Sequence, residues 1–127
     1  MKLRIRGDSI RLRVTQSELE TLKTVGEISD AIRFTEESKL VYRLLTTNDV
    51  PAPQASFTAD TIVVRLPEST ATDWATTDAV SVRADQKIGI GAELSILVEK
   101  DFACLAPREG EDDSDMFANP DAGSSNC

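Results

Sequence analysis

Histidine is absent from this chain of 127 residues, and only two cysteines are present. Without histidine the sequence lacks the commonest general base, the Ser/His and Cys/His nucleophile pairs, and the imidazole ligands of zinc. The cysteines, Cys104 and Cys127, lie on either side of a polar tail, and in a reducing compartment we expect both to be free thiols. Cys104 follows the last apolar segment, where a cysteine usually packs as a small hydrophobic residue.

Long apolar runs are also missing. The longest, Ile62–Val64 and Ser95–Val98, end well before the ~20 residues that a transmembrane helix needs. The first residues resemble a strand and lack the apolar stretch of a secretory signal. With 40% hydrophobic residues, the chain can form one soluble domain that buries roughly two thirds of its unfolded surface. We therefore expect a cytoplasmic protein with no membrane partner.

The charge is acidic and unevenly distributed along the chain. Of the formal net charge of −8, residues 101–127 contribute −6, because seven acids there accompany one arginine. Phosphate affinity depends on a surplus of Lys and Arg, so the chain as a whole is predicted not to bind nucleic acid. Residues 106–127 are expected to form an acidic, partly disordered tail, in which Met116 and Phe117 dock on a domain formed by residues 1–105.

The first fourteen residues carry most of the basic character. Alternation of side chains predicts a two-stranded hairpin whose core face holds Leu3, Ile5, Ile10, Leu12 and Val14. The opposite face would hold five cations, which are Lys2, Arg4, Arg6, Arg11 and Arg13. Arginine suits an anion site because its planar fork binds phosphate or carboxylate through two hydrogen bonds. The same pattern also fits an ordinary solvent-facing surface with cross-strand ion pairs.

The remaining pattern predicts further strands and two short helices. Thr15–Glu18 has the spacing of a capping box, and Gly26 can end the helix that follows. A second helix is expected to begin at Thr70, to carry Trp74 and to end near Thr77. Strands are expected at residues 27–34, 39–46, 57–66, 80–84 and 93–102. This order predicts an α+β fold with a mainly antiparallel sheet, either open or curled towards a barrel, and no internal repeat is evident.

Carboxylates on the last strand suggest partners for the cations. Alternation places Glu93, Glu99 and Asp101 on its outward face. Together with the hairpin cations and with Arg43 and Arg65, they would form either a lattice of salt bridges or a binding site. Carboxylates on adjacent strands can also hold a hard cation such as magnesium, so these three acids are candidate metal ligands.

Two segments carry a resemblance to known proteins. Residues 1–18, MKLRIRGDSIRLRVTQSE, and residues 98–105, VEKDFACL, resemble the signature segments of a family of small uncharacterised bacterial proteins with no assigned activity. The Leu3–Arg6 strand with Glu93, Glu99 and Asp101 is also similar in kind to the triphosphate-tunnel enzymes. Those enzymes are antiparallel barrels that bind polyphosphate with Arg and Lys and hold a metal with glutamates. Their N-terminal Glu-x-Glu-x-Lys motif is absent from this sequence.

Three functions follow from these patterns. The first is a non-catalytic module that binds an anionic small molecule or an acidic protein segment on the basic hairpin face. The second, implied by the fainter resemblance, is a metal-dependent phosphohydrolase. The third is an interaction protein in which the hairpin serves only as scaffold. The cofactor, if there is one, does not follow from the sequence.

Overall fold

A computed structural model describes residues 1–102, 115 and 117 of the chain. Residues 1–102 form eight strands and two helices. In chain order these are β1 (Lys2–Ile5), β2 (Ser9–Val14), α1 (Gln16–Val25), β3 (Glu27–Arg33), β4 (Lys39–Thr47), β5 (Gln54–Thr58), β6 (Thr61–Pro67), α2 (Glu68–Thr76), β7 (Ser81–Gly89) and β8 (Ala92–Lys100).

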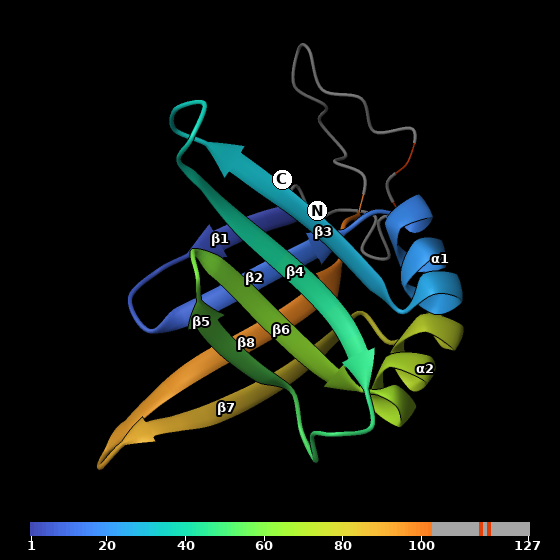
Figure 1. The fold of residues 1–127 in the computed structure, drawn as a ribbon. Helices are drawn as coiled ribbons and strands as arrows, with labels where there is room; N and C mark the ends of the chain where they lie inside the picture. Colours follow the sequence, from blue (N-terminus) through green and yellow to red (C-terminus); the bar gives the residue numbers. More distant parts are fainter. Residues whose placement is uncertain (103–114, 116, 118–127) are drawn as a thin grey trace.

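The strands form two four-stranded sheets that lie one in front of the other (Figure 1). Sheet A has the order β1-β2-β8-β7 and sheet B the order β3-β4-β6-β5. Four of the strand pairs are antiparallel hairpins, and the parallel pairs β2–β8 and β4–β6 join the hairpins within each sheet. The predicted α+β class with mainly antiparallel pairing and two helices is confirmed, and the strands do not close into a barrel.

The core lies between the sheets and is closed at one end by the helices. The central strands β2, β4, β6 and β8 contribute its fully buried side chains, including Leu12, Leu44, Val64 and Val98. Both helices lie at the same end of the sandwich (Figure 1). Trp74 of α2 is 2% exposed there, and its indole N–H donates to a main-chain oxygen, so the buried ring leaves no polar atom unpaired.

The two halves of the chain repeat the same order of elements, hairpin, helix, hairpin. β1 and β5 begin 52 residues apart, as do β2 and β6 and the two helices. Each half gives its first hairpin to one sheet and its second hairpin to the other. The sequence pattern did not indicate this repeat. Corresponding positions in the two halves are alike mainly in being apolar, and an apolar residue can occupy many positions of any strand. In β2 and β6 the corresponding pairs are Ile10 and Ile62, Leu12 and Val64, Arg13 and Arg65, and Val14 and Leu66.

The first hairpin and the first helix form as the sequence predicts. Leu3 pairs with Leu12 and Arg4 with Arg11 across β1 and β2, so apolar and basic side chains separate onto opposite faces. The capping box at α1 is present, because Thr15 accepts from the Glu18 amide and the Glu18 carboxylate accepts from the Thr15 amide. Gly26 ends α1 with a φ of 88°, a left-handed conformation that favours glycine.

Three predicted elements were wrong in their details, and one of them is β7, which was expected at residues 80–84 and runs from Ser81 to Gly89. The strand expected over residues 57–66 is a hairpin, because Ala59 and Asp60 both adopt positive φ and reverse the chain. These residues lack the glycine that usually marks such a turn, so the pattern gave no turn signal. The second helix begins at Glu68 rather than Thr70, after Pro67, which supplies no side-chain cap. A proline next to the first turn fits there because the first amides of a helix have no partner within it.

Candidate basic face on sheet A

Two rows of side chains cross the outer face of sheet A. The first row runs from Arg4 on β1 through Arg11 on β2 and Leu97 on β8 to Arg83 on β7. The second row follows the same strands and holds Lys2, Arg13, Glu99 and Ser81. We call the five cations of these rows the basic face: Lys2, Arg4, Arg11, Arg13 and Arg83. Because strands lie about 4.8 Å apart, the first row is about 14 Å long.

Glu99 binds the two central arginines of this face. Its Oε1 atom accepts from Nε of Arg11 and from Nε of Arg13, both at 2.6 Å. Nη2 of Arg11 lies at the same distance from that oxygen. The Glu99 side chain is only 12% exposed, whereas those of Arg11 and Arg13 are 31% and 25% exposed. Glu99 therefore offsets the repulsion between two neighbouring guanidinium groups and fixes their orientation.

Asp101 is the second carboxylate at this end of the sheet. Its Oδ2 atom lies 3.2 Å from Nζ of Lys2. The Asp101 amide donates to the Val14 carbonyl at 2.8 Å, which continues the pairing of β8 with β2 by one residue. Asp101 is buried, and Oδ2 has no hydrogen bond in the described part of the chain. Among the described residues, Lys2 is therefore the cation that compensates the negative charge of Asp101.

The acids on this end of the sheet do not balance the basic face. Three carboxylates, Glu99, Asp101 and Asp85, accompany five cations on this face, which leaves a formal excess of two positive charges. Arg4 and Arg83 are both exposed and form no ion pair or side-chain hydrogen bond with any residue that the structure describes. Leu97 is half-buried between Arg11 and Arg83 and separates the arginines of the first row with an apolar side chain.

Three cations that the sequence grouped with this site lie elsewhere. Arg6 is in the turn between β1 and β2 and is exposed. Arg43 and Arg65 lie on sheet B, where Nε of Arg43 donates to Glu27 at 2.6 Å and Nη1 of Arg65 donates to Ser56 at 2.8 Å. The structure therefore brings together four of the seven predicted cations, and it adds Arg83. Arg83 lies within the predicted strand of residues 80–84, but the sequence did not show that β7 joins β2 through β8 in one sheet.

The three predicted metal ligands do not meet at one point. Glu93 and Glu99 are six residues apart on one strand, a separation of about 20 Å. Glu93 pairs in register with Lys87, at the far end of the β7–β8 hairpin from Asp101. In the described residues, no group of three potential ligands among Cys, Asp and Glu is close enough to hold a metal ion.

Parts of the acidic tail contact the domain beside this face. Asp115 accepts hydrogen bonds from the amide and the hydroxyl of Ser17 in the first turn of α1, and the side-chain bond is the main reason why its pKa is lowered. The Phe117 ring packs edge-on against Phe102 at 5.8 Å, and Nζ of Lys100 lies 5.6 Å from its centre. The expected docking of Phe117 is confirmed. The rest of the predicted tail, with Cys104 and Met116, lies outside the described residues.

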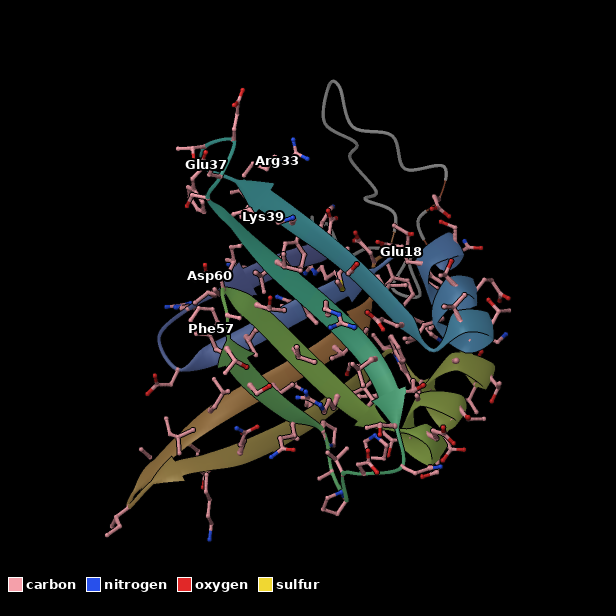
Figure 2. The ribbon with its side chains drawn as sticks, in the orientation of Figure 1. Glu18, Arg33, Glu37, Lys39, Phe57 and Asp60 are labelled. Carbon is pink, nitrogen blue, oxygen red and sulfur yellow. The ribbon has the colours of Figure 1, made fainter. Side chains whose placement is uncertain are left out.

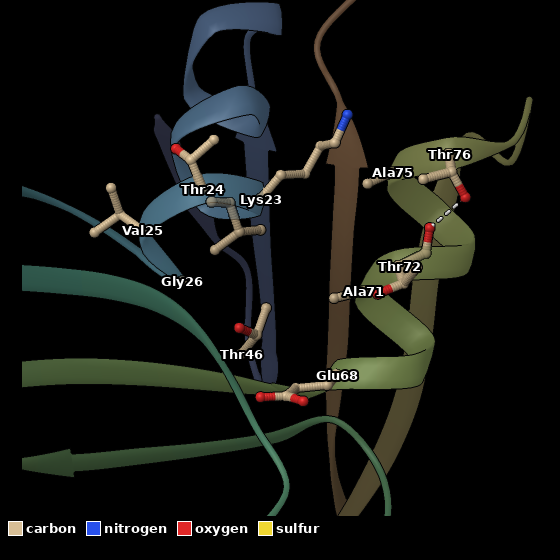
Figure 3. A pocket seen from close by; sticks show the side chains of 11 residues that line it. Lys23, Thr24, Val25, Gly26, Thr46, Glu68, Ala71, Thr72, Ala75 and Thr76 are labelled. Atoms are coloured by element: carbon tan, nitrogen blue, oxygen red, sulfur yellow. Dashed lines mark hydrogen bonds between the residues drawn. The ribbon is translucent and has the colours of Figure 1, made fainter.

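A separate cavity of about 480 Å³ lies between the two helices (Figure 3). Its charged side chains are Lys23 from α1 and Glu68 from α2. Nζ of Lys23 already binds Glu20, and the Thr76 hydroxyl donates to the Thr72 carbonyl across one turn of α2. The polar side chains of this cavity do not converge on a shared point (Figure 3).

A model of a family of unknown function, DUF7009, matches residues 1–121. The chain belongs to this family. DUF7009 carries no assigned activity, so membership agrees with the resemblance to uncharacterised proteins and adds no reaction. Comparison with curated proteins and with solved structures finds no match. Neither helix of this DUF7009 member is long and apolar enough to cross a membrane, as judged over the residues that the structure describes.

Proposed function

We propose that this DUF7009 protein is a non-catalytic module that binds an anionic small molecule or an acidic protein segment on the basic face. The observation that carries the proposal is the shared carboxylate of Glu99. One buried acid holds Arg11 and Arg13 side by side, while Arg4 and Arg83 have no acidic partner among the described residues. A second anion from outside the fold would offset the remaining repulsion.

The shape of the basic face favours an extended ligand with more than one negative charge. The guanidinium groups of the first row are spread over about 14 Å, a length that a single phosphate does not span. Glu99 already orients Arg11 of this row and Arg13 of the second row, so part of the entropy cost of ordering these side chains on binding is met within the fold. Leu97 offers a small apolar contact at the centre of the row. A polyphosphate chain or a peptide with alternate acidic residues has this distribution of charge.

The phosphohydrolase alternative finds no support in the geometry of the described residues. Metal-assisted hydrolysis needs carboxylates that converge on the ion. Glu99 is occupied by two arginines, and Glu93 is about 20 Å away along the strand. We therefore do not propose a reaction for this site.

Thermal unfolding with added anions tests the proposal. Inorganic phosphate, tripolyphosphate and a Glu-rich peptide are each added at low salt, because surface charge is screened at high salt. A ligand present at 100 times its Kd stabilises the folded state by about 2.7 kcal/mol, so tripolyphosphate or the peptide should raise Tm by several degrees. Failure of every anion to raise Tm at low salt would refute the proposal.

Variants locate the effect on the basic face. Arg4→Gln and Arg83→Gln change exposed side chains, so we expect them to leave the Tm of the free protein nearly unchanged. Both should reduce the increase in Tm caused by the anion. Arg33→Gln is the matched control, because Arg33 is an exposed arginine at the end of β3 on the other sheet (Figure 2). Equal losses in all three variants would show that binding reflects only the total charge.

A further inference from the structure

A second cavity opens between the sheets at the end away from the helices. Its volume is about 370 Å³, which lies within the range of about 300–1,000 Å³ typical of small-molecule sites. Both sheets contribute apolar walls, with Ile10 and Leu94 from sheet A and Ile62 and Phe57 from sheet B. Figure 2 labels Phe57 at this end and Glu18 on α1 at the other. The site is therefore distinct from the basic face, which lies on the outside of sheet A.

Side chains of the inner faces are left open to solvent here. Phe57 faces the same way as the buried Ala55 on β5. Ile88 lies where the pairing of β7 is irregular, between Lys87 and Gly89, and its side chain lines the same cavity. Although all three line the cavity, Phe57 is 63% exposed, Ile88 is 50% exposed and Ile5 of β1 is 60% exposed. The helices fill the space between the sheets at the opposite end, but no described element fills it here. An apolar body in this cavity would remove these surfaces from water.

Most polar side chains around the cavity are already bonded within the fold. Their hydrogen bonds join Ser9 to the Arg6 carbonyl at 2.6 Å, Ser56 to Arg65 at 2.8 Å, and Gln86 to both main-chain polar groups of Ala55 at 2.7 and 2.9 Å. Asp8 differs from them. It is the ionisable residue of the cavity wall, and its carboxylate has no hydrogen bond or ion pair within the described part of the chain. Arg6 is in the same turn but forms no ion pair with Asp8 and does not line the cavity.

We propose that this cavity binds a small cationic amphiphile, an alkyl or aryl group that carries an ammonium. The apolar body would lie between the sheets against Phe57, Ile62 and Ile88, and the ammonium would lie at the Asp8 carboxylate. A fatty-acid carboxylate would meet the same negative charge and be repelled.

Three ligands with the same chain and different head groups test this assignment. Octylammonium, octanol and octanoate are titrated into the full chain, and amide shifts around Phe57 and Ile88 are followed by NMR. We expect octylammonium to bind about threefold more tightly than octanol, the size of effect typical of an exposed ion pair, and octanoate to bind most weakly. In Asp8→Asn the affinities for octylammonium and octanol should become equal. No saturable binding of any of the three, or tightest binding of octanoate, would overturn the proposal.

A pair of matched variants separates the cavity from general surface hydrophobicity. Phe57→Ser removes an exposed phenylalanine that lines the cavity, so it should lower the affinity for all three ligands at least severalfold. Phe34→Ser removes an equally exposed phenylalanine, 67% against 63%, which does not line it and should leave the affinities unchanged. Because both side chains are exposed, neither change should unfold the protein. Equal effects of the two variants would contradict a site at the cavity.

Discussion

Substitution of Glu99 by glutamine tests how strongly one carboxylate organises the basic face. Removing one partner of a buried ion pair destabilises a protein by about 3–5 kcal/mol. At this site Arg11 and Arg13 are 31% and 25% exposed, so water replaces part of the lost charge and the effect is smaller. Glutamine also keeps an acceptor oxygen. We therefore expect Glu99→Gln to lower the free energy of unfolding by about 2 kcal/mol.

Urea denaturation measures this change through the single tryptophan. Trp74 belongs to α2 and is 2% exposed in the core, so its fluorescence reports global unfolding. For a domain of this length, 2 kcal/mol corresponds to a decrease in Tm of about 8 °C. Glu93→Gln is the matched control, because Glu93 lies on the same strand and face but is exposed. Its effect should stay within about 0.5 kcal/mol.

Two results would refute the reasoning about Glu99. The first is a Glu99→Gln variant as stable as Glu93→Gln. That result would mean that the hydrogen bonds of Glu99 to both arginines make no net contribution to the free energy of unfolding. The second is an additive double-mutant cycle between Glu99→Gln and Arg13→Gln, because side chains in direct contact should show a coupling energy of about 0.5 kcal/mol or more. High salt should weaken the effect only in part, since the carboxylate is mostly buried.

Three further predictions concern other contacts. Gln86→Leu should destabilise the fold by about 1–3 kcal/mol and speed hydrogen exchange at the Ala55 amide, because the glutamine amide bonds both main-chain polar groups of Ala55. Thr15→Ala should cost about 1 kcal/mol in urea denaturation through loss of the N-cap of α1. The pKa of Asp115 is lowered from 3.8, so its contact with Ser17 should persist above that pH and be lost as the pH falls through the lower folded value. The NMR shift of the Ser17 amide reports this loss.

Each of these predictions has its own control. Gln54→Leu changes an exposed glutamine on β5 and should leave Ala55 exchange unchanged. Thr72→Ala changes an exposed threonine inside α2 and should leave stability nearly unchanged or slightly raised. Asp115→Asn should remove the pH dependence of the Ser17 shift. A Ser17 amide that titrates unchanged in this variant would assign the transition to another group.

Local patterns predicted much of the first hairpin and of α1. The period-two alternation of residues 2–5 and 9–14 was enough to separate Leu12 from Arg11 and Arg13, because pairing within a hairpin follows from the neighbouring sequence. The capping box at Thr15 was equally local. The inward and outward faces of β8 were also predicted, since Ile96 and Val98 are buried while Glu99 meets the arginines of β2.

Pairing between distant strands could not be predicted in this way. The parallel contacts of β2 with β8 and of β4 with β6 decide which hairpins share a sheet. They place Arg83 in the row of Arg11 and put Arg65 on the other sheet, although Arg65 and Arg13 occupy corresponding positions in the two halves. A strand with one apolar and one polar face fits either sheet, so alternation alone does not choose between them.

The interleaving of the two halves has a consequence for how this protein unfolds and how it can be divided. Residues 1–47 and 54–100 each contain two hairpins and a helix, but every sheet needs one hairpin from each half. A chain cut in the connection at residues 48–53 would yield fragments that both expose the inner faces of unfinished sheets. Neither fragment is a folding unit, so the two should be stable only as a reassembled pair. The intact chain should lose both sheets in one cooperative transition.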